Sequence, residues 1–132
     1  MNILFVDDYP NVKVQHAIQY LKSQNVEFTY EIVKSFNSAY RYIASHFDKI
    51  DLAVIDLGLP RFDDSDEYDK LEGLRLVEIM SRKKITIPVI INSTTEIPNE
   101  KEYLESYMER NVIIKHVQFL DGKWLNEFLK QL

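Results

Sequence analysis

Short apolar runs alternate with amphipathic helical patterns along the chain. Most of the runs are continuous, which indicates strands covered on both faces. The predicted strands span residues 2–6, 26–33, 52–55, 87–92 and 112–114. Each run is followed by apolar residues spaced three and four positions apart, the spacing of a helix that buries one face. The predicted helices follow Pro10, cover 36–47 and Gly73–Arg82, start at Pro98, and include Trp124–Leu129.

The order strand-then-helix, repeated five times, predicts an α/β fold. Such alternation favours a five-stranded, doubly wound parallel sheet with right-handed crossovers and helices on both faces, a three-layer sandwich. A length of 132 residues with 45% hydrophobic residues suits one domain over 1–132. One segment breaks the rhythm, because residues 61–72 form a long predicted loop between the third strand and its helix.

Composition narrows the chemistry. The sequence contains no cysteine, which excludes disulfides, zinc–thiolate sites and thiol catalysis. No apolar run reaches the length of a membrane span, and the first ten residues lack the features of a signal peptide. We therefore expect a cytoplasmic protein without a membrane partner.

Charge is unevenly distributed. The net charge is -5, and residues 61–72 (RFDDSDEYDKLE) contain six acidic and two basic residues, so the rest of the chain is close to neutral. No basic stripe is available to neutralise phosphates, which argues against direct nucleic-acid binding. A solvated loop is the simpler interpretation of the acidic segment, and docking of a basic partner or of cations is the alternative.

Polar residues follow four of the predicted strands. Asp7 and Asp8 follow the first, Asp56 the third, residues 92–94 (Asn-Ser-Thr) the fourth, and Lys115 the fifth. Sites in open parallel sheets form beyond the carboxyl ends of the strands. We therefore expect three carboxylates, a hydroxyl and an ammonium group to meet at one edge.

Each of these residues also has a purely structural interpretation. The acids, Ser93 and Thr94 could cap turns or helices, and a lysine at a strand end is commonly solvated. Three clustered carboxylates, however, repel one another, and one lysine cannot offset them all. A divalent cation would offset this repulsion, and ligands that are all oxygen favour Mg2+. A carboxylate beside Mg2+ can accept a phosphoryl group, whose oxygens would contact Ser93 and Lys115.

In this setting the chain resembles the receiver domain of two-component response regulators. The resemblance covers essentially the whole chain and depends on five stretches in order: FVDDYP, VIDLGLP, EGLRL, PVIINST and IIK. It implies a flavodoxin-like fold with Asp56 as phosphoacceptor, Ser93 as the hydroxyl that follows the phosphoryl group, and Lys115 as its cationic partner. The implied Mg2+ ligands are Asp7 (through water), Asp8, Asp56 and the carbonyl of Gly58.

The resemblance also implies a function. We expect a phosphoacceptor switch that receives its phosphoryl group from a sensor histidine kinase or a phosphotransfer protein and then changes its affinity for a downstream protein. Such a domain is not an enzyme beyond its own phosphorylation and dephosphorylation. The chain ends directly after its last predicted helix, so no output domain is expected.

Three features depart from the family pattern. Residues 61–72 separate Pro60 from Gly73, where the family has only a few residues. His116 replaces the proline that usually follows the lysine, and Val112 stands where an aromatic switch residue is common. We expect His116 to form a local hydrogen bond rather than to act in catalysis.

Two tyrosines in the fourth predicted helix, Tyr103 and Tyr107, could provide another readout, although packing against the core is the simpler interpretation.

Alternative functions stay open. A degenerate receiver-like module that binds partners without phosphate is favoured by His116 and Val112 but opposed by the intact acids. A phosphohydrolase of the haloacid-dehalogenase type needs two aspartates two positions apart, whereas Asp7 is followed there by Tyr9. A flavin site is disfavoured, because Asp7 and Asp8 would repel its phosphate.

Overall fold

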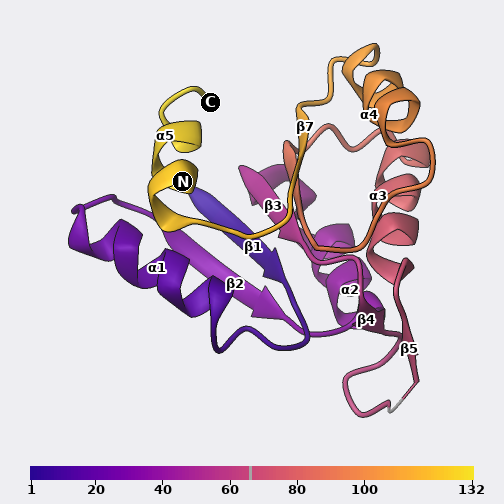
Figure 1. Ribbon diagram of the computed structural model, residues 1–132, viewed down its shortest axis with the longest axis horizontal. Helices are drawn as coiled ribbons and strands as arrows, with labels where there is room; N and C mark the ends of the chain where they lie inside the picture. The colour runs from indigo at the N-terminus through magenta and orange to yellow at the C-terminus, as the bar shows by residue number, and fades with distance from the viewer. Residues whose placement is uncertain (66) are drawn as a thin grey trace.

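The computed structural model describes residues 1–65 and 67–132. It contains a five-stranded sheet of order β2-β1-β3-β6-β7, in which every neighbouring pair is parallel, between two layers of helices (Figure 1). This is the predicted α/β fold. Asp66, which belongs to the predicted acidic loop, lies outside the described residues.

The elements follow the predicted order. The strands of the main sheet are β1 (Asn2–Val6), β2 (Thr29–Val33), β3 (Leu52–Ile55), β6 (Val89–Asn92) and β7 (Ile114–Val117). The helices are α1 (Lys13–Ser23), α2 (Phe36–His46), α3 (Glu72–Arg82), α4 (Glu100–Met108) and α5 (Gly122–Leu129), and the 3-10 turn η1 (Phe47–Lys49) follows α2. None of the helices in the described residues is long and apolar enough to cross a membrane.

The sheet is buried on both faces. Helices α1 and α5 lie on one face, and α2, α3 and α4 lie on the other (Figure 1). In β1, Ile3 and Phe5 pack toward α1 and α5, whereas Leu4 and Val6 pack toward α2 and α3. Successive residues of a strand point to opposite faces, so a strand covered on both sides is apolar throughout.

Three strand boundaries differ from the prediction. β2 begins at Thr29, β6 begins at Val89 after Pro88, and β7 covers Ile114–Val117 rather than 112–114. The last difference follows from the end of α4: the N–H of Val112 donates to the carbonyl of Tyr107 at 3.1 Å, so Val112 completes the turn that closes the helix.

The predicted loop over residues 61–72 contains folded structure instead. β4 (Leu59–Pro60) and β5 (Tyr68–Asp69) form a separate two-stranded antiparallel sheet, which lies beside the start of α3 (Figure 1). Arg61 and Glu72, the ends of the segment, form an ion pair with 3.1 Å between Nη2 and Oε1. Strands of two residues are too short to leave a periodic pattern in the sequence, so they could not be predicted.

Candidate functional site

Three carboxylates meet beyond the carboxyl ends of β1 and β3. The backbone N–H of Asp56 donates to the carbonyl of Val6 at 2.8 Å, which holds the end of β3 beside the end of β1. Asp7, Asp8 and Asp56 each offer one carboxylate oxygen, and these atoms lie within 4.8 Å of one another. Asp7 is buried, Asp56 is half-buried and Asp8 is exposed. The predicted convergence of the three acids is therefore observed.

Two of the acids also shape the turns in which they lie. Asp7 Oδ1 accepts a hydrogen bond from the N–H of Tyr9 at 2.8 Å, and Asp56 Oδ1 accepts one from the N–H of Gly58 at 3.3 Å. Neither Asp7 nor Asp8 caps α1, because Val12 is the N-cap residue and provides no side-chain bond. Turn formation thus accounts for one oxygen of Asp7 and of Asp56, and leaves the clustering of all three acids unexplained.

Burial and mutual repulsion disfavour the ionised acids. Burial, followed by the charge of Asp7, raises the pKa of Asp56 to about 6, against the N–H of Gly58 and the charge of Lys13, which lower it. Burial is also the main cause that raises the pKa of Asp7, where the N–H of Tyr9 opposes it. A cation bound between these carboxylates would relieve both effects.

Helix α3 begins against the backbone of Asp56. The N–H of Gly73 donates to the carbonyl of Leu57 at 2.9 Å. A Cβ on residue 73 would lie 2.0 Å from the carbonyl oxygen of Asp56. Only glycine permits this approach, and it fixes the chain directly behind the carboxylate.

The end of β6 contributes buried polar groups. The N–H of Ser93 donates to the carbonyl of Val117 at 3.0 Å, and its hydroxyl accepts from the N–H of Thr95 at 3.1 Å. The preceding residue, Asn92, is also buried, and its Oδ1 has no hydrogen-bond partner among the described residues. Because Ile91 pairs with Ile55, Asn92 lies at the same row of the sheet as Asp56.

The lysine whose charge acts on the pKa of the acids is not the predicted one. Lys115 lies inside β7, paired with Ile90, and the strand continues two residues beyond it to Val117. The prediction that Lys115 follows the strand end was therefore wrong. The half-buried Lys13, at the start of α1, is the lysine whose charge lowers the pKa of both Asp7 and Asp56. Its signal in the sequence was only its position, the first base after Asp7-Asp8.

Tyr68 is a second residue that the sequence did not indicate. Its side chain lies against Gly58, where a Cβ would be 2.0 Å from the phenol oxygen. Partial burial, followed by the charges of Asp56 and Asp8, raises the pKa of Tyr68. The pairing of β5 with β4 brings it there, and nothing in the sequence pattern specifies that pairing.

His116 joins two elements next to the site. Its Nε2 donates to the carbonyl of Ser93 at 2.8 Å, and its Nδ1 pairs with the carboxylate of Glu100, the first residue of α4. The expected hydrogen bonding of His116 is observed, but its partners are distant in sequence: Ser93, directly after β6, and Glu100 in α4. Every peptide bond of the described residues is trans.

Tyr107 belongs to the core cluster and Tyr103 packs against it, with 3.1 Å between their hydroxyl oxygens. This agrees with the packing interpretation.

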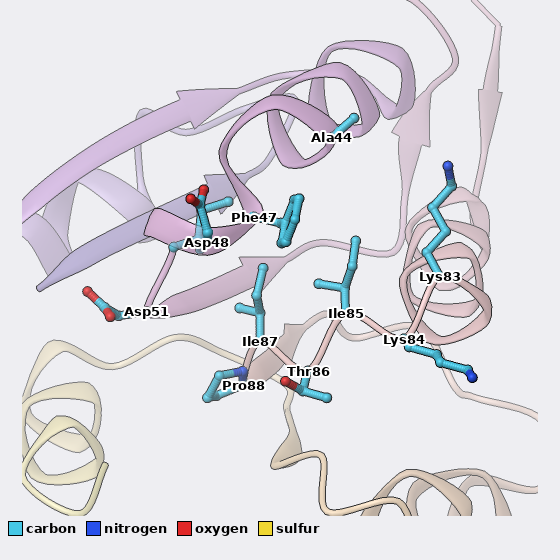
Figure 2. A pocket seen from close by; sticks show the side chains of 11 residues that line it. Ala44, Phe47, Asp48, Asp51, Lys83, Lys84, Ile85, Thr86, Ile87 and Pro88 are labelled. Atoms are coloured by element: carbon cyan, nitrogen blue, oxygen red, sulfur yellow. The ribbon is translucent and has the colours of Figure 1, made fainter.

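One surface pocket of the described residues lies away from the acids. It has a volume of about 550 Å3 and lies at the amino ends of β3 and β6, opposite the acids. Figure 2 shows Phe47, Ile85 and Ile87 pointing toward one another there, whereas Asp51 and Lys84 point away. Binding sites combine apolar walls with convergent polar groups, and the charged groups of this pocket do not converge.

Known proteins resemble the chain in structure rather than in sequence. No protein-family model and no curated protein sequence matches it.

Three solved structures superpose over nearly its whole length. A DNA-binding response regulator of the LuxR family from Staphylococcus aureus has a TM-score of 0.70 at 17% identity, with 98% of this chain and 96% of that one covered. The signal receiver domain of an HD domain-containing protein from Pseudomonas fluorescens Pf-5 has a TM-score of 0.69 at 19% identity, with 98% and 91% covered. The Mn(2+)-bound form of the response regulator Rcp1 has a TM-score of 0.63 at 18% identity, with 98% and 89% covered. The chain therefore has the fold of a response regulator receiver domain.

Proposed function

We propose that this protein is a phosphoacceptor switch of a two-component phosphorelay, modified on Asp56. The observation that carries the proposal is the convergence of Asp7, Asp8 and Asp56, whose oxygens lie within 4.8 Å of one another at the carboxyl edge of a receiver-type sheet. Fold alone does not define a function, but this donor set suits one chemistry in particular. Clustered carboxylates that destabilise one another in the free protein are suited to a cation and a phosphoryl group.

The residues present fit Mg2+. Asp8 and Asp56 would hold the ion together with the carbonyl of Gly58, Asp7 would act through water, and this donor set contains only oxygen, which Mg2+ prefers. The unpartnered, buried Oδ1 of Asn92 also indicates a site that is completed by a group outside the protein. When bound, the ion neutralises charge on the acids and on the incoming phosphoryl oxygens. A neighbour in structure, Rcp1, is known in a Mn(2+)-bound form.

The transfer itself needs a nucleophile and positive charge. A carboxylate oxygen of Asp56 attacks the phosphorus of a phosphohistidine on the donor, a P–O bond forms, the P–N bond breaks, and the imidazole leaves and takes up a proton. With a pKa of about 6, Asp56 is mostly ionised at neutral pH and can attack. Lys13 stabilises the negative charge at the site, and Lys115 turns its exposed side chain toward the phosphoryl group once that group is present. The Ser93 hydroxyl exchanges its bond from Thr95 for one to a phosphoryl oxygen.

The donor is a sensor histidine kinase or a phosphotransfer protein, and the modified domain binds a downstream protein with altered affinity. A population shift between two states is sufficient for this output. We place the exchange in the cytoplasm, where the donor obtains its phosphoryl group from ATP. Turnover of other substrates is not part of this function.

The test is phosphorylation by a small phosphodonor. Incubation with Mg2+ and acetyl phosphate should add the mass of one phosphoryl group, located on Asp56 by peptide mass spectrometry. The Asp56→Asn variant should gain none. A wild-type protein that stays unmodified would favour the degenerate interaction module, whose acids serve only their turns.

A further inference from the structure

Tyr68 lies beside the proposed phosphoacceptor. Its ring fills the space that a side chain on Gly58 would take, since a Cβ there would be 2.0 Å from its hydroxyl oxygen and 2.6 Å from its Cζ. The N–H of the same glycine donates to Asp56 Oδ1 at 3.3 Å. The phenol and the Asp56 carboxylate therefore flank one residue.

Core packing does not explain this position. The Tyr68 side chain is 61% exposed, so its ring is not held in a hydrophobic cluster. No hydrogen bond to its hydroxyl occurs within residues 1–65 and 67–132. A phenol is protonated at neutral pH and donates hydrogen bonds. Tyr68 thus presents a phenol donor close enough to Asp56 and Asp8 for their charges to act on it.

The hairpin that carries Tyr68 is tied to the domain. Pro60 pairs with Tyr68 between β4 and β5. At the neck, Arg61 pairs with Glu72, whose side chain is only 3% exposed. The hydroxyl of Ser38 in α2 donates to Asp63 at 2.9 Å. These contacts tie the hairpin to α2 and to the start of α3.

We propose that Tyr68 covers the phosphoryl group carried by Asp56, with its hydroxyl donating a hydrogen bond to a phosphoryl oxygen and its ring excluding water. The inference rests on the proposed function of Asp56. Hydrolysis requires water to attack phosphorus in line with the Asp56 oxygen; the P–O bond to Asp56 then breaks, and inorganic phosphate and the free carboxylate result. A ring in front of the phosphorus slows this attack, and it also slows the approach of a donor. The acidic insertion therefore sets the lifetime of the signal.

The first test compares three single variants after phosphorylation with acetyl phosphate and Mg2+. Loss of a hydrogen bond to a charged group corresponds to roughly a ten-fold change in rate. Tyr68→Ala should lose its phosphoryl group about ten-fold faster than wild type and also gain it faster. Tyr68→Phe, which keeps the ring without the donor, should fall between the two. The matched control is Phe62→Ala, which removes another half-exposed aromatic ring of the same insertion and should behave as wild type.

A second test displaces the ring without changing it. No glycine of the described residues has a positive φ, so the backbone of residue 58 accepts alanine, whose Cβ would take the place of the phenol. Gly58→Ala should hydrolyse its phosphoryl group about as fast as Tyr68→Ala, and the double variant should be no faster. If the two substitutions accelerate hydrolysis additively, the proposal that Tyr68 covers the phosphoryl group is wrong.

The outcomes separate this inference from the function on which it rests. If wild type is phosphorylated and the Tyr68 and Gly58 variants gain and lose the phosphoryl group at the wild-type rates, the role proposed for Tyr68 is wrong. The proposed function of Asp56 is then still supported. If neither wild type nor any variant is phosphorylated, both are wrong. If wild type resists modification and Tyr68→Ala accepts it, the proposal that Tyr68 shields Asp56 is supported, and the proposal that the wild-type protein is a phosphoacceptor switch is wrong. If Tyr68→Ala does not fold, Tyr68→Phe and Gly58→Ala still test the role proposed for Tyr68.

Discussion

At the scale of single residues, the charges around Asp56 are not balanced within the protein. Burial and the charge of Asp7 raise the pKa of Asp56 to about 6, and of the lysines only Lys13 acts against this shift. Acids that only shape turns need not be brought this close to one another. The cation of the proposed function would relieve this imbalance.

The first prediction concerns the stability of the metal-free protein. Since the pKa of Asp56 is higher in the folded state, the folded state binds more protons between about pH 4 and 6, and its stability falls as the pH rises through that window. Asp56→Asn should therefore stabilise the protein in EDTA by about 1–2 kcal/mol at pH 7.5, after a discount for partial exposure, and by much less at pH 4. Urea unfolding at both pH values measures this. An equal effect at both would contradict it.

The second prediction separates the two lysines. Lys13→Met removes the charge that favours ionised Asp56, so the pKa of Asp56 in EDTA should rise by about half a unit. Lys115→Met should leave that pKa unchanged, because Lys115 lies inside β7, but it should slow phosphorylation by acetyl phosphate about ten-fold or more. NMR titration of the carboxyl carbon and the phosphorylation rate provide the two readouts. Equal behaviour of the two variants would contradict this division.

The sequence could predict the acids but not their neighbours. Asp7 and Asp56 stand out because each ends a continuous apolar run, and the parallel topology brings such ends together. Lys13 reaches the site from the first turn of a helix, and Tyr68 through a hairpin of two-residue strands. No periodic pattern in the sequence places either residue beside the acids, so only the three-dimensional structure could identify them.

At the scale of elements, His116 connects the end of β6 with the start of α4. Its two ring nitrogens bond the carbonyl of Ser93 and the carboxylate of Glu100. In this chain Val112 takes no part in such a link, because it lies in the core at the end of α4. Under the proposed function, we expect a change at Ser93 to reach α4 through His116.

The third prediction tests this connection. His116→Phe keeps a planar aromatic ring, slightly larger than imidazole, but leaves the carbonyl of Ser93 and the carboxylate of Glu100 without their partner, at a cost of about 1–2 kcal/mol. Amide hydrogen exchange should accelerate in the first turn of α4 and stay unchanged in β6. The matched control is His46→Phe, because His46 bonds to the carbonyl of Tyr42 within its own helix and so does not join two elements. Unchanged exchange in α4 would show that the link is not structural.

Element boundaries were predictable where strands are covered on both faces. β1 and β3 match their apolar runs at both ends, since burial alone defines them. β7 was misplaced because Val112 is buried for another reason, as it closes α4 through Tyr107, and because Ile113 is exposed although it is apolar. An apolar run alone therefore does not decide which of its residues belong to a strand.

At the scale of the whole molecule, the domain separates into a core and an appendage. Two hydrophobic clusters fill the two sides of the main sheet, and they include Leu57, Leu59 and Leu74 around the insertion but none of the described residues 61–65 and 67–70. The hairpin instead depends on its own pairing and on the polar contacts of Arg61 and its neighbours. The fold should therefore not need it.

The fourth prediction removes the appendage. Replacing residues 62–70 by a short Gly/Ser linker keeps the Arg61–Glu72 pair, so the melting temperature should change by only a few degrees. Leu57→Ala, at a fully buried position of the core, should instead cost about 2–5 kcal/mol and serves as the comparison for real core damage. Because Tyr68 leaves with the hairpin, the shortened protein should lose its phosphoryl group as fast as Tyr68→Ala does. A shortened protein that is as unstable as Leu57→Ala would show that the hairpin belongs to the core. A stable shortened protein that keeps its phosphoryl group as long as wild type would show that the insertion does not act at Asp56.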